Sequence, residues 1–265
     1  MWGRGRVSRV APRLRSPEHP LLGMPRRDLA VTLLLGVATA ALFVLMAWHG
    51  SRSSIQRIDD AFLRRMIAVR SGFLTAIAKG FNFLGLVYVT LPVRILVAGF
   101  LAVRRRWWHF AAFVSAIVLS EISIGTLKGL YDRSRPLGSL VHTSGHSFPS
   151  GHAVAASVTV VAAVIALLPE GPSRYAWGAA AVAFSLLMGL SRAYLAAHWL
   201  SDAVAGVLLG TSFALATALV VHVLRERLQP SDPRADRADP VRTRSAVRAG
   251  PAARPPRGGW RRGRR

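Results

Sequence analysis

The sequence predicts an all-α integral membrane protein, a bundle of six transmembrane helices with an amphipathic helix at the membrane interface. Two observations support this fold class: 52% of the 265 residues are hydrophobic, yet the formal net charge is +23. A soluble nucleic-acid-binding protein rarely has so apolar a composition, and the same apolar content excludes an intrinsically disordered chain. The charged and the apolar residues must therefore lie in separate parts of the chain.

Apolar runs separated by short charged turns mark the six expected transmembrane helices, at residues 29–48, 80–103, 107–127, 153–168, 175–190 and 203–224. The first run has twenty residues without a charge. Arg94 and Glu121 interrupt the second and third runs, and they should face the bundle interior and pair with each other or with Lys128. The fourth and fifth runs span only about 24 Å each as helices, so they should extend into the flanking loops or tilt little.

Two segments near the first run need a separate interpretation. Because basic residues precede this run, a cleaved signal peptide is an alternative to a membrane anchor. The run is too long and its cleavage-site pattern too poor, which favours an uncleaved anchor. Residues 55–79 alternate basic with large apolar side chains, a pattern typical of a helix that lies at the membrane interface.

The distribution of basic residues predicts three regions: a basic cytoplasmic tail (1–27), a membrane domain (28–228) and a disordered, Arg- and Pro-rich cytoplasmic tail (229–265). With the N-terminus inside, 24 of the 35 Lys and Arg residues lie on the cytoplasmic side, as the positive-inside rule requires. Both termini are then cytoplasmic. We expect the tails to bind anionic lipid headgroups rather than nucleic acid; oligomeric state has no signal in the sequence.

Three polar clusters stand out in the apolar body, in the loops that follow the third and fifth runs. An even number of spans puts both loops on the same, outer, face. The clusters are Lys128 to Arg135-Pro136, then Pro149-Ser150-Gly151-His152, then Ser191-Arg192 followed by His198 and Asp202.

The cationic residues of these clusters predict a phosphate site that needs no metal. Lys128, Arg135 and Arg192 supply fixed positive charge, and an arginine can contact two phosphate oxygens at once. Ser150 and Gly151 should open a helix, whose free backbone N–H groups attract an anion.

The acid–base residues predict nucleophilic catalysis by histidine. His198 and Asp202 are four residues apart at a helix start, so they share a face. A carboxylate on one imidazole nitrogen fixes the tautomer and leaves the other nitrogen free to attack. His152 is then the general acid for the leaving oxygen and the base for water. The chain has no cysteine, which excludes disulfides, zinc–thiolate sites and thiol nucleophiles.

Together the clusters resemble the motifs of the membrane-bound type 2 phosphatidic acid phosphatase family, which shares its fold with vanadium haloperoxidases and bacterial acid phosphatases. The resemblance covers roughly residues 55–225, with the motifs at 128–136, 149–152 and 191–202. It implies a six-helix membrane phosphatase with an extracytoplasmic site, a phosphohistidine on His198 and no metal or other cofactor. It further implies that Asp202 supports His198, that His152 protonates the leaving group, and that phosphate is bound by Lys128, Arg135, Ser150, Gly151 and Arg192.

The function expected from this resemblance is hydrolysis of a lipid phosphate or diphosphate at the outer face of a bacterial plasma membrane. Undecaprenyl diphosphate is the first candidate substrate. Phosphatidic acid, phosphatidylglycerol phosphate and other polyprenyl phosphates stay open, because the motifs specify the phosphate and not the tail. The alternatives are a lipid phosphotransferase and a non-enzymatic lipid-binding or transport protein.

Two loop residues outside the expected site, His146 and Arg133, need a separate interpretation. Ser144-Gly145-His146 repeats the Ser-Gly-His of the second motif, but it lacks the preceding proline and the apolar helix that should follow, so we assign the motif to His152 rather than to His146. Arg133, inside the first motif, is expected to contact lipid headgroups at most.

Overall fold

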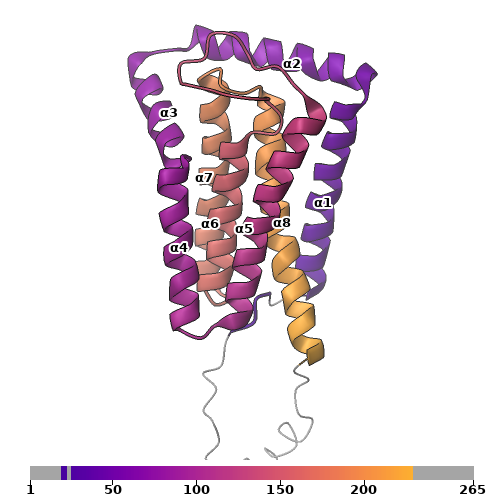
Figure 1. Cartoon of the computed structure of the whole chain (residues 1–265), viewed down its shortest axis with the longest axis vertical. Helices are drawn as coiled ribbons and strands as arrows, with labels where there is room; N and C mark the ends of the chain where they lie inside the picture. The colour runs from indigo at the N-terminus through magenta and orange to yellow at the C-terminus, as the bar shows by residue number, and fades with distance from the viewer. Residues whose placement is uncertain (1–18, 23–24, 229–265) are drawn as a thin grey trace, which may run out of the picture. The chain divides into compact units, whose positions relative to one another are not determined.

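The computed structural model describes residues 19–22 and 25–228, and this part of the chain is all-α. Its eight helices are α1 (Pro25–Ala47), α2 (His49–Ala68), α3 (Gly72–Leu84), α4 (Val87–Val103), α5 (Trp107–Tyr131), α6 (Gly151–Leu167), α7 (Pro172–Tyr194) and α8 (Leu200–Leu228) (Figure 1). Residues 226–265 form a separate unit, described only at 226–228. The expected tail at 229–265, and residues 1–18 of the expected N-terminal tail, lie outside the described residues.

Helices cover all six apolar runs, but fewer of them qualify as full membrane spans. The helices α1, α5, α7 and α8 are long and apolar enough to cross a membrane. The span expected at 80–103 is not one straight helix: α3 and α4 meet there at a bend of 49°, and only the two together pass as a candidate span. The helix α6 has 17 residues. The described part thus has four candidate spans, or five with the bent pair, and a count of six stays a prediction.

The amphipathic segment expected at 55–79 is divided between two helices. The helix α2 ends at Ala68, and α3 begins at Gly72 after Ser71, whose side-chain oxygen accepts a hydrogen bond from the backbone N–H of Leu74 at 3.2 Å. Such an N-cap satisfies a donor that would otherwise be unpaired. In Figure 1, α2 crosses the upper end of the bundle, and α3 turns down into it. Only the first part of the segment therefore lies across the end.

The helix α6 forms the centre of the bundle. It packs against α5 and α7, and ten of its 17 residues are buried. Gly206 and Gly210, one turn apart on α8, allow α8 to approach α6 closely. A Cβ atom at Gly206 would lie 2.7 Å from the carbonyl oxygen of Ser150, so no larger side chain fits. This close approach brings the start of α8 beside the start of α6.

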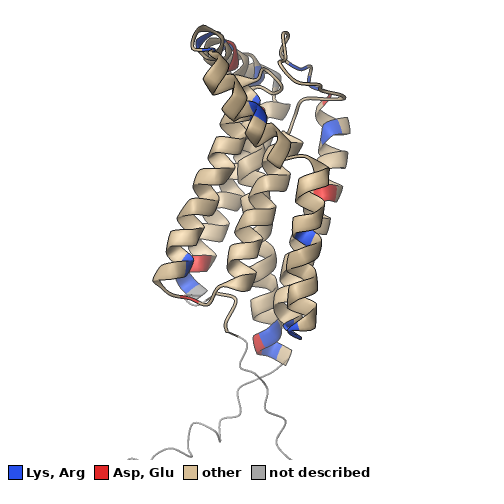
Figure 2. Ribbon diagram, turned by 90° about the vertical axis from the view of Figure 1, so that its left-hand side faces the viewer, with Lys and Arg blue, Asp and Glu red and all other residues tan. Residues whose placement is uncertain are grey.

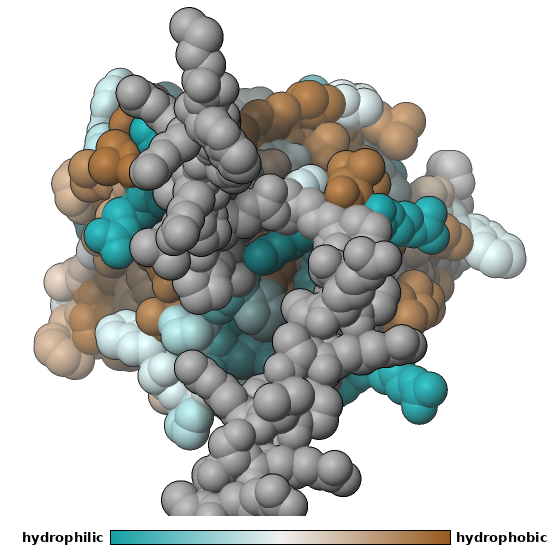
Figure 3. Space-filling view, turned by 90° about the horizontal axis from the view of Figure 1, so that it is seen from below, coloured by the Kyte–Doolittle hydropathy of each residue, from teal (hydrophilic) through white to brown (hydrophobic). Residues whose placement is uncertain are grey.

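The outward sides of the peripheral helices are apolar, as lipid contact requires. Leu34 on α1 and Leu96 on α4 are 69% and 71% exposed. Charged residues gather at the two ends of the helices (Figure 2), and brown, hydrophobic residues line much of the periphery seen from below (Figure 3). Arg94 and Glu121 are exceptions within the helices. They pair at 2.7 Å, which confirms the pairing expected from the sequence, but only Arg94 faces the interior, because the side chain of Glu121 is 49% exposed.

Candidate active site

The residues of the three motifs meet at the end of the bundle that α2 crosses. There α5 and α7 end, and α6 and α8 begin (Figure 1). Lys128 lies in the last turn of α5, Arg135 in the following loop, Ser150, Gly151 and His152 at the start of α6, Arg192 in the last turn of α7, His198 in the loop after it, and Asp202 in the first turn of α8. The two motif-bearing loops therefore lie at the same end of the bundle, as the sequence predicts.

The imidazole of His198 is held by a backbone group. Its Nδ1 lies 2.7 Å from the carbonyl oxygen of Ser147 and 3.6 Å from Oδ2 of Asp202. Since the carbonyl can only accept, Nδ1 carries the proton and Nε2 keeps its lone pair. Burial lowers the pKa of His198 to about 4, although Asp202 opposes this effect. The ring is therefore neutral at pH 7, in the tautomer that a nucleophile requires.

Asp202 is fully buried and surrounded by hydrogen-bond donors. Its Oδ2 accepts from the backbone N–H of Trp199 at 2.9 Å and from the hydroxyl of Ser147. Its Oδ1 accepts from Nη1 of Arg133 at 2.6 Å. Donors on both oxygens keep the carboxylate charged and fix its orientation beside His198.

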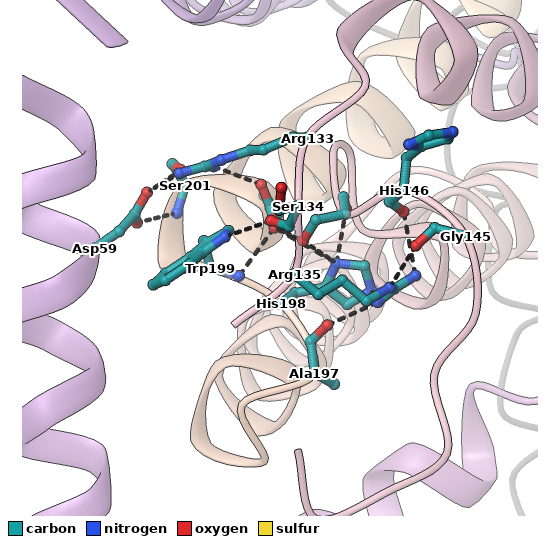
Figure 4. A network of polar contacts seen from close by, with 12 residues as sticks. Asp59, Arg133, Ser134, Arg135, Gly145, His146, Ala197, His198, Trp199 and Ser201 are labelled. Carbon is teal, nitrogen blue, oxygen red and sulfur yellow. Dashed lines mark hydrogen bonds and ion pairs between the residues drawn. The ribbon is translucent and has the colours of Figure 1, made fainter. Parts of the chain in front are cut away.

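The guanidinium of Arg135 is fixed by backbone carbonyls and faces His198 (Figure 4). It donates to Gly145 at 2.9 Å, Ser144 at 2.8 Å, His146 at 3.2 Å and Ala197 at 2.7 Å. Its Nη1 also lies 3.0 Å from Nε2 of His198. A phosphoryl group bound at Nε2 would replace this last contact and would meet a cation that is already in position.

Further donors converge at the start of α6. Ser150 Oγ, His152 Nε2 and Arg192 Nε are buried and have no hydrogen-bond partner within the described residues. Buried polar atoms are nearly always hydrogen-bonded, so a group of unpaired ones points to a ligand. A Cβ atom at Gly151 would lie 3.9 Å from Nζ of Lys128, which places the ammonium over the helix N-terminus.

The donor set suits an oxyanion. Among residues 19–22 and 25–228, no group of three or more His, Cys, Asp or Glu side chains is arranged to hold a metal ion. Fixed cations and helix N–H groups are instead the partners that phosphate oxygens prefer.

The repeated tripeptide at 144–146 contributes carbonyls rather than a second catalytic histidine. The side chain of His146 is half exposed and pairs with Asp132 at 2.7 Å. Its backbone carbonyl, with those of Ser144 and Gly145, accepts from Arg135. The His152 imidazole lies instead within the field of Lys128, Arg135 and Arg192.

The expectation for Arg133 is wrong. Its side chain is only 3% exposed and pairs with Asp59 on α2 (Figure 4). It also pairs with Asp202 on α8. Sequence reasoning also missed Asn82 on α3, whose side-chain oxygen accepts from Arg192. Asp59 was missed as well, because it is one of two adjacent acidic residues, Asp59 and Asp60, among the basic residues of this segment, and nothing marks it out from Asp60.

The comparisons with known proteins agree with this geometry. The model of the PAP2 superfamily matches residues 109–226, which contain all three motifs. An undecaprenyl-diphosphatase from Sulfolobus acidocaldarius is 31% identical over 153 residues, which cover 55% of this chain and 68% of that protein. The chain belongs to the PAP2 superfamily.

Two further similarities extend the comparison of this PAP2 protein. Phosphatidylglycerophosphatase B from Bacillus subtilis is 26% identical over 180 residues, 66% of this chain and 88% of the relative. A crystal structure of a transmembrane PAP2-type phosphatidylglycerolphosphate phosphatase from Bacillus subtilis has the same fold, with a TM-score of 0.63 at 23% identity over 76% of this chain and 98% of that one. The chain is a multi-pass membrane lipid phosphatase of the PAP2 family.

Proposed function

We propose that this phosphatase hydrolyses a lipid phosphate or diphosphate through a phosphohistidine intermediate on His198, without a metal. One observation carries the proposal. The Nδ1–H of His198 is held by the Ser147 carbonyl at 2.7 Å, while Nε2 faces the guanidinium of Arg135 at 3.0 Å. A neutral imidazole is thus oriented, with its lone pair directed at a fixed cation where a phosphoryl group can bind.

In the first step, Nε2 of His198 attacks phosphorus and a P–N bond forms. The bond from phosphorus to the lipid oxygen breaks, and His152 donates a proton to that oxygen. For a diphosphate, the terminal phosphorus is attacked and the lipid monophosphate leaves. Lys128, Arg135 and Arg192 offset the negative charge of the phosphoryl oxygens throughout.

In the second step, water attacks the phosphohistidine. His152, now neutral, accepts a proton from the water, and the P–N bond breaks. Inorganic phosphate leaves and His198 regains its lone pair. The proton that His152 gave in the first step returns in the second, so the cycle is balanced.

The site adjoins an apolar groove that suits a hydrocarbon chain. The groove, of about 310 Å³, lies between α2, α3 and α7 and is lined by residues that include Leu74, Leu187, Leu190 and Ser191. Ser191 lines the groove and Arg192 follows it in the last turn of α7, so the groove and the proposed phosphate site lie at the same end of this helix. We take undecaprenyl diphosphate as the first candidate substrate, supported by the name of the Sulfolobus relative and the expected outer location. Phosphatidylglycerol phosphate and phosphatidic acid are the next candidates.

A phosphate-release panel in detergent with EDTA tests the function. We would use undecaprenyl diphosphate, farnesyl diphosphate, dioctanoyl phosphatidic acid and dioctanoyl phosphatidylglycerol phosphate. The wild-type chain should release phosphate in EDTA, and His198→Ala should lose nearly all activity. With a labelled phosphoryl group, the wild type should form a protein adduct that is stable to base and labile to acid. Activity that requires metal or survives His198→Ala would refute the mechanism.

The panel also separates hydrolysis from phosphoryl transfer. A lipid phosphotransferase needs an acceptor other than water, so it would release little phosphate until an alcohol acceptor is added. Free phosphate at the full rate without an acceptor would support hydrolysis.

The proposed orientation puts both termini in the cytoplasm and the site on the extracytoplasmic face. The absence of cysteine makes single-cysteine labelling direct. Leu137, in the loop at the site, is 91% exposed, and Leu228, at the end of α8, is 69% exposed. In intact cells a membrane-impermeant maleimide should label Leu137→Cys and not Leu228→Cys. The reverse pattern would overturn the orientation.

A further inference from the structure

A buried chain of charges connects α2 to the nucleophile. Arg133 is at its centre: Nη2 donates to Asp59 Oδ2 at 2.7 Å, and Nη1 donates to Asp202 Oδ1 at 2.6 Å. Asp59 and Asp202 are 1% and 0% exposed. Asp202 in turn lies beside Nδ1 of His198. All three charged groups are therefore shielded from water, in a setting where electrostatic interactions are strong.

Several neutral groups complete the chain and leave it little freedom. Asp59 accepts from the backbone N–H of Ser201 at 2.9 Å and from its hydroxyl at 2.6 Å. Arg133 also donates to Gln56 Oε1 at 2.7 Å, and its guanidinium carbon lies 5.5 Å from the ring centre of Trp199. A planar guanidinium with two carboxylates on its two ends has one orientation. Asp59 thus determines where the Nη1 end of Arg133 points.

We propose that Asp59 and Arg133 are positioning residues of the phosphatase reaction, and that they act through Asp202 on His198. Neither side chain touches the phosphate site. Arg133 holds Asp202 so that Oδ2 faces Nδ1 of His198, and Asp59 holds Arg133. The helix α2 at the end of the bundle is thereby part of the device that orients the nucleophile. This inference rests on the proposed role of His198 as the nucleophile.

The charge balance explains why two acids are needed. Without Asp59, Asp202 would be the one carboxylate that balances the buried charge of Arg133. Arg133 would then draw Asp202 toward itself and away from His198. With two, Asp202 retains enough negative charge to stabilise the imidazolium character that develops when Nε2 attacks. The second acid comes from an element outside the three motifs.

The test is a double-mutant cycle on the full chain in detergent, with the most active lipid of the panel above. Asp59→Asn keeps the size and the accepting oxygen but removes the charge. We expect kcat to fall on the order of tenfold with KM unchanged. In an Asp202→Asn background the same change should have almost no further effect, because its route to His198 is gone. Asp132→Asn, an exposed acid next to Arg133, is the matched control and should retain wild-type kcat.

Arg133→Lys is the second variant, in case the buried asparagine prevents folding. It keeps the charge, but one ammonium cannot bridge both carboxylates in the same way, so kcat should fall and KM stay constant. Equal losses from Asp59→Asn in both backgrounds, or a rise in KM alone, would show a merely structural role and overturn the inference. No phosphate release by the wild type would instead refute the proposed function, so the two failures are distinct.

Discussion

Gly85, at the break between α3 and α4, lies against the imidazole of His152. A Cβ atom at this position would be 2.6 Å from Cδ2 of His152 and 3.2 Å from Cε of Met188. Both distances are shorter than ordinary van der Waals contact, so the ring and the glycine cannot both stay in place if a methyl group is added. The bend of the α3–α4 pair is thus coupled to the position of the proposed general acid.

Gly85→Ala should therefore impair catalysis more than folding. A shift of His152 by about 1 Å is expected to reduce kcat about a hundredfold, because proton transfer depends on the distance to the leaving oxygen. Gly80→Ala is the matched control, since nothing lies within 4 Å of a Cβ there. It should keep full activity, and thermal unfolding should show it slightly stabilised, by about 0.5–1 kcal/mol, because alanine favours a helix. Equal kcat values for the two variants would contradict the proposed contact.

Asp202→Asn and Ser147→Ala should differ in a defined order. The Ser147 carbonyl holds the Nδ1–H of His198 and is present in both variants, so the tautomer persists. Asp202→Asn removes the buried charge, and we expect kcat to fall about 10²–10⁴-fold. Ser147→Ala removes one donor to Asp202, and we expect a loss of about tenfold or less. Single-turnover phosphate release measures both. A larger loss from Ser147→Ala would show that the hydroxyl, and not the carboxylate, orients the ring.

The pH dependence follows from the buried His198. Burial lowers the pKa of His198 in the free enzyme to about 4, so the proposed nucleophile is neutral down to that pH. The acid limb of the kcat/KM profile, where activity falls as the pH drops, should therefore lie near pH 4. An acid limb near the ordinary histidine pKa of about 6.5 would contradict this.

The same shift also affects stability. The unfolded chain binds a proton at His198 below about pH 6.5, and the folded chain does not until about pH 4. Folding stability should therefore be fully present above pH 6.5 and fall as the pH drops from 6.5 to 4. The Tm of His198→Gln should decrease less over this range than that of the wild type.

The sequence was sufficient for the parts of the site whose residues occur close together in the chain. His198 and Asp202 are separated by one helical turn, and Ser150 to His152 open a single helix. These two groups were expected to meet because the loop after α5 and the loop after α7 are separated by two helices. A chain that crosses the bundle twice returns to the same end. Arg94 and Glu121 were paired correctly for a different reason: an unpaired charge within an apolar helix is energetically costly, so two such charges are expected to pair.

The remaining parts depend on contacts that no local pattern encodes. Arg133 meets Asp59 across 74 residues of sequence, and neither residue is unusual in its own segment. The Ser147 carbonyl that holds His198 is a backbone group, which carries no signature in the sequence. The break between α2 and α3 was not predicted either, because the amphipathic pattern continues through residues 69–71 although the helix does not.

The groove between α2, α3 and α7 leads to a prediction about chain length. Leu187 lines this groove and its neighbour Leu186 does not, although both side chains are exposed, at 47% and 58%. Leu187→Trp should fill part of the groove and reduce kcat/KM for undecaprenyl diphosphate about tenfold. Activity on p-nitrophenyl phosphate, which has no hydrocarbon chain, should be unchanged.

Leu186→Trp adds the same bulk one residue away and should leave both substrates unaffected, since its side chain faces the lipid. The ratio of kcat/KM for the two substrates is the decisive quantity, because a general loss of folded protein lowers both values equally. If Leu187→Trp and Leu186→Trp give the same ratio as the wild type, the hydrocarbon chain of the substrate lies elsewhere. A ratio that falls only for Leu187→Trp would place the hydrocarbon chain along α7, toward Ser191 and the proposed phosphate ligand Arg192.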